Sequence, residues 1–210
     1  MKYLSLYILC FFISIQAMAQ TAWKKAKDKD GIVIYTRTHE NKGLTEFKAH
    51  ISLNASLSCV AAVLTSGSNY PNWVYKVAST QKLNGEIPDQ TWNYYTVSMP
   101  WPLSNRDGIS RTTVKEASSE KVWLEQVAQP KYIAEKKDHV RLLRTDTNWK
   151  LEKAVDGKVK VTYQMLADPG GVPNWLVNLF LLDGPMETLN GLRKEVKKEK
   201  FKQAKLDWIK

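Results

Sequence analysis

From Thr91 to Asp168, apolar and polar residues alternate with a period of two, which is typical of antiparallel strands that bury one face. Prolines and an Asp-Gly pair interrupt the alternation. The pattern therefore predicts five strands, over residues 92–99, 108–115, 122–129, 139–153 and 158–167. Asp156-Gly157 between the last two strands is typical of a hairpin turn.

Before this region, two short apolar runs over residues 32–36 and 47–53 predict a pair of strands. Residues 23–29 are polar and indicate a short helix or a lead-in. A helix is expected from a cap at Asn54 or Ser56 to Gly67, and a short helical piece is expected from Tyr70. This part of the chain thus predicts strand, strand and helix.

After residue 168 the apolar period becomes helical. An apolar stripe begins at Trp175 and resumes after Gly184-Pro185 at Met186, with spacings of three and four. Pro185 should kink this helix or divide it in two. An amphipathic helix laid across the apolar face of a long sheet gives an α+β fold.

Residues 1–19 have the three parts of a secretory signal: Lys2 near the start, an apolar run, and Ala17-Met18-Ala19 as a cleavage site. We expect cleavage after Ala19, export to the periplasm or the medium, and one domain over residues 20–210. The run is shorter than the roughly 20 apolar residues of a membrane-spanning helix. Cys59 is the cysteine that remains, and we expect it to be buried.

The chain carries a formal charge of +10, and its last part is the most basic. From Arg193 to the end, eight Lys or Arg stand against three acidic residues. Because an exported protein rarely meets nucleic acid, an anionic membrane surface is the better partner. A solvated helix face is the alternative explanation.

Three stretches, in this order, are more specific than the pattern: residues 99–107 (MPWPLSNRD), 168–176 (DPGGVPNWL) and 185–193 (PMETLNGLR). Together they resemble the START family of lipid-transfer domains, over nearly the whole chain from about residue 23. The resemblance implies a helix-grip fold, in which a curved antiparallel sheet wraps around a long C-terminal helix and encloses a hydrophobic cavity. It also implies a carrier that binds or transfers a lipid, without catalysis. We expect a monomer with no cofactor and no metal.

The strand and helix patterns turn a set of large residues toward the apolar side, where they would line such a cavity. These are Trp149, Leu151, Tyr163, Met165, Trp175, Leu176 and Phe180. A chain of about 14 carbons would gain roughly 11 kcal/mol from burial, at about 0.8 kcal/mol per methylene. The alternative is that these aromatic side chains fill a closed core.

Arg106 and Arg111 could reach inward and hold a lipid head group through a forked hydrogen bond. An inward arginine must otherwise pair with an acid, because an unpaired buried charge costs several kcal/mol. A direct pair between Arg106 and Asp107 is not assured, since neighbours in a strand point to opposite faces.

A metal site or hydrolase has little support. His39, His50 and His139 are far apart, and no serine lies in a Gly-x-Ser-x-Gly motif. A cyclase or aromatase of similar fold, with an inward Arg, Tyr or Asp as acid or base, stays open as the enzyme alternative.

Two surfaces complete the prediction. The basic segment from about residue 197 to 210 has the composition of an interfacial helix, with Lys198, Lys200, Lys202, Lys205 and Trp208 as membrane contacts. A membrane-surface protein without an internal ligand is a third possibility. The gate of the cavity is expected at the loop of Tyr132 and Ile133, with Gly170, Gly171 and Gly184 as hinges.

Overall fold

The structure, a computed structural model, describes residues 22–39, 44–168 and 174–210. Within these residues, ten strands form one sheet in the order β1-β2-β3-β10-β9-β7-β6-β5-β4, and β8 pairs with β6 outside this path. The strands are β1 Lys24–Lys29, β2 Ile32–His39, β3 Leu44–Leu53, β4 Val77–Glu86, β5 Gln90–Val97, β6 Arg106–Ala117, β7 Lys121–Ala128, β8 Val140–Arg141, β9 Arg144–Lys153 and β10 Val159–Asp168. Neighbours on the path are antiparallel, and β8 runs parallel to β6.

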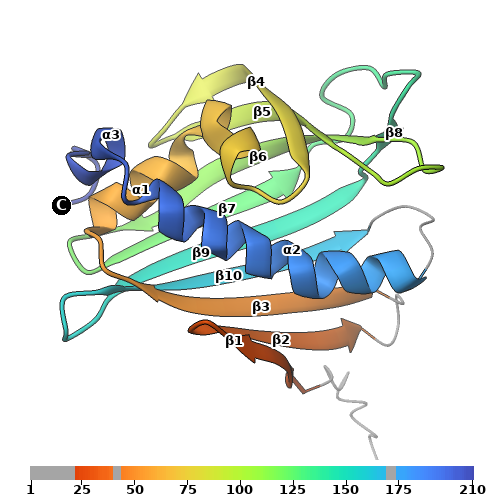
Figure 1. Ribbon diagram of the computed structural model, residues 1–210. Helices are drawn as coiled ribbons and strands as arrows, with labels where there is room; N and C mark the ends of the chain where they lie inside the picture. Colours follow the sequence, from red (N-terminus) through yellow and green to blue (C-terminus); the bar gives the residue numbers. More distant parts are fainter. Residues whose placement is uncertain (1–21, 40–43, 169–173) are drawn as a thin grey trace, which may run out of the picture.

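The described helical segments are α1 Leu57–Thr65, the 3-10 helix η1 Gly67–Asn72, α2 Asn174–Glu195 and α3 Glu199–Lys202. The sheet curves around α2, which crosses its concave face (Figure 1). The predicted α+β helix-grip fold is therefore confirmed.

The core lies between α2, α1 and the concave face of the sheet. Val159, Val161 and Tyr163 of β10 are buried while Lys160 between them is exposed, as the alternation predicts. Met186 and Leu189 of α2 pack into the same core.

Pro185 lies inside α2 and does not divide it. A proline removes one hydrogen bond of the helix. The buried residues that follow it hold the second half of α2 against the core, which keeps the helix continuous.

The structure differs from the prediction in three places. Residues 24–29 form a strand, β4 was not predicted, and the predicted strand 139–153 is two strands, β8 and β9. Since β1 and β4 are the two edges of the sheet and are mostly polar, backbone pairing holds them and no apolar alternation marks them. Leu142 and Leu143 separate the two strands, because β8 pairs with β6 whereas β9 pairs with β7 and β10.

The end of the chain packs against the core. The expected interfacial helix is wrong in its extent, because α3 covers four residues. Phe201 is buried, and Leu206, Trp208 and Ile209 contact the core cluster. The apolar side of this segment is thus used within the protein.

Ser56 caps α1 by accepting a hydrogen bond from the Cys59 N–H (3.1 Å). Cys59 itself is buried, as expected. Among the described helices, none is long and apolar enough to cross a membrane. The proposed signal, residues 1–19, lies outside the described residues.

Candidate functional site

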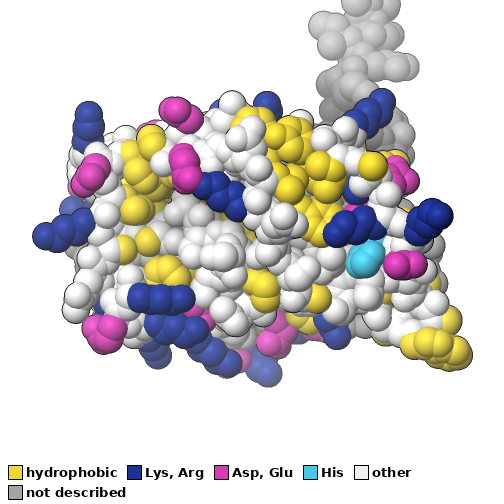
Figure 2. All heavy atoms as spheres, turned by 90° about the horizontal axis from the view of Figure 1, so that it is seen from above, with side chains coloured by type: hydrophobic (Ala, Val, Ile, Leu, Met, Phe, Trp, Pro, Cys, Tyr) yellow, Lys and Arg dark blue, Asp and Glu magenta, His cyan; other side chains and the backbone are white. Residues whose placement is uncertain are grey.

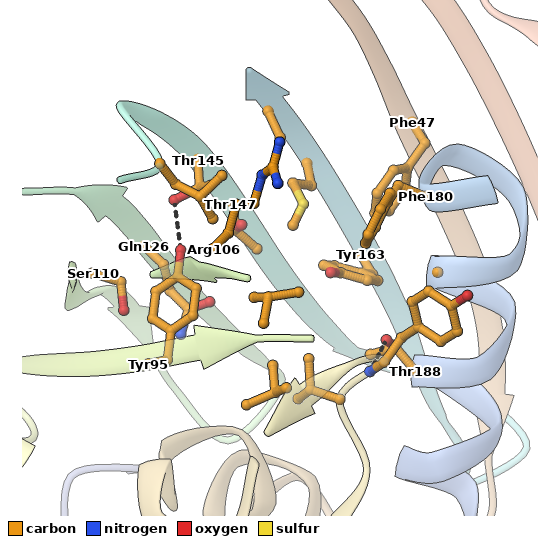
Figure 3. Close-up of a pocket in the computed structure, with 18 of the residues that line it drawn as sticks. Phe47, Tyr95, Arg106, Ser110, Gln126, Thr145, Thr147, Tyr163, Phe180 and Thr188 are labelled. Atoms are coloured by element: carbon orange, nitrogen blue, oxygen red, sulfur yellow. Dashed lines mark hydrogen bonds between the residues drawn. The ribbon is translucent and has the colours of Figure 1, made fainter. Parts of the chain in front are cut away.

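A cavity of about 480 Å³ lies between α2 and the concave face of the sheet (Figure 3). Its walls come from β3, β5, β6, β7, β9 and β10, from the segment after η1, and from α2. The inward positions of the strands supply the side chains because successive residues of a strand alternate between faces. The site is therefore built mainly on rigid strands.

Aromatic rings form one wall of the cavity. Tyr163 of β10 stacks on Trp149 of β9, with ring centroids 3.9 Å apart and planes within 1°. Phe47 meets the edge of Tyr163 at 4.9 Å. Phe180 of α2 packs against Tyr75 at 5.9 Å. This wall offers apolar contact along the length of a chain or ring system.

Polar side chains gather toward the other end. Ser110 of β6, Gln126 of β7 and Thr147 of β9 all line the cavity there, with Tyr95 and Thr145 beside them (Figure 3). The hydroxyl groups of Tyr95 and Thr145 share a hydrogen bond of 3.2 Å. The cavity thus has an apolar part and a polar end.

Gln126 is fixed in place by two hydrogen bonds. Its amide nitrogen Nε2 donates to Tyr70 Oη (3.0 Å) and to Thr112 Oγ1 (3.2 Å). Tyr70 in turn donates to the backbone carbonyl of Leu64 (2.7 Å). Burial raises the pKa of Tyr70 to about 12, so its phenol stays neutral.

Arg106 and Asp168 are the charged side chains among the described lining residues, one of each sign. Arg106 is buried and donates to the backbone carbonyl of Ser104. Burial lowers the pKa of its guanidinium, which nevertheless remains a cation in proteins. The lining therefore adds no net charge to the cavity.

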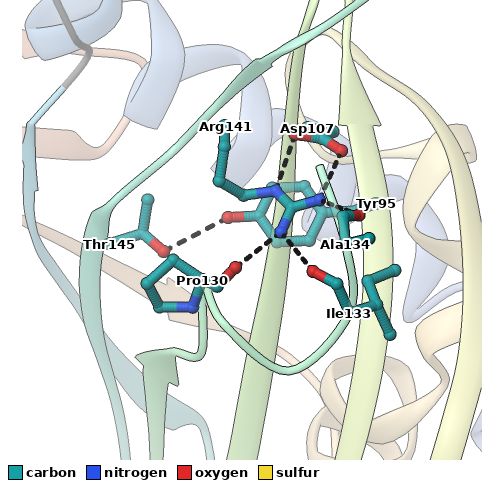
Figure 4. Close-up of polar contacts among 7 residues, drawn as sticks. All are labelled: Tyr95, Asp107, Pro130, Ile133, Ala134, Arg141 and Thr145. Carbon is teal, nitrogen blue, oxygen red and sulfur yellow. Dashed lines mark hydrogen bonds and ion pairs between the residues drawn. The ribbon is translucent and has the colours of Figure 1, made fainter. Parts of the chain in front are cut away.

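On the opposite, outer face of β6, Asp107 forms a buried ion pair with Arg141 of β8 (Figure 4). Arg141 donates from Nε (2.8 Å) and Nη2 (3.0 Å) to the two carboxylate oxygens. It also donates to the backbone carbonyls of Pro130, Ile133 and Ala134. Every N–H side of this guanidinium is used within the protein.

The pKa of Asp107 reflects two opposing causes. Burial by itself raises the pKa, but the hydrogen bonds and charge of Arg141 outweigh it and lower the pKa below its ordinary value. The pKa of Arg141 is raised, chiefly by the hydrogen bonds to Asp107. The pair is therefore ionised, and it ties the 130–134 loop to β6.

Comparison with known proteins gives the family. No family model matches the sequence. A crystal structure of a STAR-related lipid transfer protein from Xanthomonas axonopodis shares 34% identity and a TM-score of 0.77, over 84% of this chain and 99% of that one. The chain belongs to the StAR-related lipid-transfer (START) family.

Two curated relatives extend this finding. A Pseudomonas aeruginosa protein without an assigned function is 31% identical to this chain, over 90% of this chain and 93% of its own length. Human phosphatidylcholine transfer protein is 28% identical over 80% of this chain and 81% of its own. The similarity therefore spans most of the chain in each case.

The START cavity includes several of the residues expected from the sequence. Trp149, Tyr163, Met165 and Phe180 line it, and so does Arg106. Leu151 is instead completely buried in the core, because it lies further along β9 than the cavity reaches.

Other expected residues lie elsewhere in the START domain. Arg111 is on the outer side of β6 and does not line the cavity, since it alternates with the inward Ser110 and Thr112. The backbone of α2 includes Trp175 and Leu176, whose side chains lie outside the described part of the chain.

Of the residues expected to form the gate, one lines the cavity and the others do not, or lie outside the described residues. Gly184 lines the cavity, whereas Gly170 and Gly171 lie outside the described residues. Tyr132 and Ile133 belong to the loop that Arg141 holds, and no residue of that loop lines the cavity. Tyr132 stacks on Trp92 with ring centroids 5.7 Å apart. A gating role for these residues stays a prediction.

Sequence reasoning missed the polar end of the cavity and the partner of Asp107. Gln126 shares the inward face of β7 with Val122 and Leu124, so a polar residue in an apolar alternation was the available signal. Arg141 stands between Val140 and Leu142, where a charged residue interrupts an apolar run.

Proposed function

We propose that the protein binds one lipid in the cavity between α2 and the sheet and carries it between membranes. The cavity, with its aromatic wall and its polar end, is the observation that carries the proposal. Membership of the START family supports it, since the similar Xanthomonas and human proteins bear lipid-transfer names.

In this proposal the hydrocarbon part of the ligand lies along Trp149, Tyr163, Met165 and Phe180. Trp175 and Leu176, at the start of α2, stay proposed contacts of the same kind. The head group lies toward Arg106, whose N–H groups can donate to its oxygens. Burial of the chain supplies the binding energy, and the polar end orients the ligand.

We also propose that two surfaces contact the membrane during exchange. Trp101 is 93% exposed and Leu143 is 64% exposed, and their near neighbours Met99 and Leu142 line the cavity. A tryptophan exposed in this way suits the interface of a bilayer. This apolar surface would thus adjoin the ligand's path.

The basic C-terminal segment is the second proposed surface. Lys198, Lys200, Lys202 and Lys205 are exposed, while Trp208 is half-buried against the core. Lysines near an anionic bilayer each contribute about 1 kcal/mol. Figure 2 shows a face with lysine and arginine side chains spread around its outline and hydrophobic side chains that also reach the surface.

We propose that the protein works outside the cytoplasm. The signal-like residues 1–19 support export, and lipid exchange between membranes in the periplasm would suit such a carrier.

A transfer assay tests the central proposal. The protein should move a fluorescent lipid from donor to acceptor vesicles, and Val97→Trp, which places an indole in the cavity, should abolish the transfer. Val127→Trp, on the outer face of β7, is the matched control and should transfer normally. Equal transfer by Val97→Trp and the parent protein would refute the cavity as the carrier site.

A further inference from the structure

Three side chains in the cavity wall carry a hydroxyl group that makes no hydrogen bond to another described residue. Ser110 of β6, Thr147 of β9 and Tyr163 of β10 are 7%, 6% and 5% exposed, and all three line the cavity. In the described part of the chain, none of their side-chain oxygens makes a hydrogen bond. These oxygens are not among the fully buried, unpaired atoms of the described residues, so they are open to the cavity. A ligand that fills the cavity would take them out of water and must therefore offer them hydrogen-bond partners.

The register of the sheet brings two of these hydroxyls to one place. Thr147 lies directly opposite Gln126, and Ser110 is two residues from Thr112, which also pairs with Gln126. Side chains opposite or diagonal on one face are neighbours. Both N–H groups of the Gln126 amide are already used, so the part of this amide left for a ligand is its carbonyl Oε1, an acceptor.

Tyr163 stands between this polar end and the apolar wall (Figure 3). Its hydroxyl can meet a polar group at the junction of a head group and a chain, such as an ester. Burial raises the pKa of Tyr163, so the phenol is a neutral donor. The hydroxyl groups can donate and accept hydrogen bonds, the amide carbonyl can accept them, and none of these groups carries a charge.

The charge balance of the wall favours an uncharged ligand. The described lining contains one cation, Arg106, and one anion, Asp168. An anionic head group would add a second negative charge to a wall with a single positive one. Buried charge without compensation is costly, whereas an uncharged head group requires no change.

The volume favours one hydrocarbon chain. At about 30 Å³ for each water-sized group, the cavity of about 480 Å³ holds on the order of 16 non-hydrogen atoms. A phospholipid with two long acyl chains needs about three times that volume on the same scale. A lipid with a single medium-length chain fits.

We infer that the cavity binds a lipid with one hydrocarbon chain and an uncharged, hydroxyl-bearing head group, such as a monoacylglycerol, whose head lies among Ser110, Gln126 and Thr147. This inference rests on the proposed function and names the class of its ligand.

Competition binding on the full mature chain, stripped of lipid, tests the class. A set with identical 12-carbon chains is used: monolauroylglycerol, laurate, lauroyl lysophosphatidate and dilauroyl phosphatidylcholine. We expect a 1:1 complex with monolauroylglycerol, at least about tenfold tighter than with either anion, and no 1:1 complex with the two-chain lipid. Tighter binding of an anion, or a stable complex with the two-chain lipid, would overturn the inference.

Variants then test the hydroxyls. Ser110→Ala with Thr147→Val should weaken monolauroylglycerol binding about 10-fold or more, at about 3- to 10-fold for each lost hydrogen bond. Methyl laurate, which has no hydroxyl, should change less than about 2-fold. Thr147→Ser keeps the hydroxyl and should retain affinity, and Thr113→Val on the outer face of β6 is the matched control.

The outcomes separate this inference from the proposed function. If the double variant, folded by circular dichroism, binds monolauroylglycerol as well as the parent protein, the inference fails. Should the double variant not fold, Ser110→Ala and Thr147→Val singly must each give the smaller loss. Binding of every lipid without regard to head group also overturns the inference but leaves the carrier function standing, whereas binding of none refutes both.

Discussion

Two buried polar sites on opposite faces of β6, the Asp107–Arg141 pair and Ser110, differ in their hydrogen bonds. On the outer face, Asp107 and Arg141 are 0% and 1% exposed, and their charged groups are fully hydrogen-bonded. On the inner face, Ser110 is nearly as buried, yet its hydroxyl has no partner in the described protein. Burial alone therefore does not distinguish the Asp107–Arg141 pair from Ser110. The two differ in that the pair is already hydrogen-bonded, whereas Ser110 opens to the cavity.

The difference has an energetic reason. Removing one partner of a satisfied buried pair destabilises the fold, because the other charge is left buried without compensation. An unsatisfied hydroxyl in a cavity costs stability until a ligand or water supplies its partner. The outer face should thus govern folding and the inner face should govern binding.

The largest expected effect comes from breaking the outer pair. Asp107→Ala leaves Arg141 as an uncompensated buried charge and should lower the free energy of unfolding by about 3 to 5 kcal/mol, measured by urea denaturation. Glu120→Ala, which removes an exposed partner of Lys153, is the control and should cost less than about 1 kcal/mol. Equal effects of the two variants would contradict the comparison.

A smaller effect is expected where the inner face is tightly packed. A Cβ on Gly108 would lie 2.5 Å from the Tyr95 ring, so Gly108→Ala should displace Tyr95 from Thr145. We expect a loss of about 1 to 3 kcal/mol and reduced lipid uptake. Gly184→Ala, whose Cβ would meet Tyr75 at 3.7 Å, is the control and should not lose stability. Unchanged lipid uptake by Gly108→Ala would contradict a role for Tyr95 in lipid binding.

The two faces should also differ in their response to pH. The pKa of Asp107 in the folded protein lies below its ordinary value of 3.8. Its contribution to stability is therefore complete above about pH 4 and is lost as the pH falls through the folded value. Because the cavity hydroxyls do not titrate, lipid affinity should stay constant between about pH 6 and 9. The Asp107→Asn variant should lose less stability in acid than the parent protein.

The smallest effect on stability is expected at the basic segment, where the charges are exposed. Replacing Lys202 and Lys205 with Gln should change the free energy of unfolding by less than about 1 kcal/mol. Lys198 and Lys200 are kept because they pair with the buried Glu195 and Asn69. Binding to anionic vesicles at low salt should weaken, while lipid capacity stays the same. Vesicle binding equal to that of the parent protein would exclude these lysines as a membrane contact.

The sequence predicted the interior of the sheet better than its edges. Strands such as β7 and β10 pack one face on the core, so their alternation is visible. β1 and β4 have no such face, and their position depends on backbone pairing. The pairing of Arg141 with Asp107 could not be predicted either. The two residues are 34 positions apart in the sequence, and the parallel pairing of β8 with β6 brings them together.

The site, too, could be predicted only where one strand's periodicity was enough. Apolar lining residues such as Trp149 and Tyr163 could be proposed from strand periodicity. The cavity's polar end could not, because it joins single residues from β6, β7 and β9 whose registers the sequence does not specify. For Leu151, periodicity correctly predicts the inward face of β9. It does not predict how far along β9 the cavity extends, and Leu151 lies in the closed core instead.

Native mass spectrometry of the protein, purified from its own host and followed by solvent extraction, tests the central claim most directly. The account predicts a mass excess of one lipid per chain, which extraction removes and identifies. A bare protein that also takes up no fluorescent lipid from vesicles would contradict it.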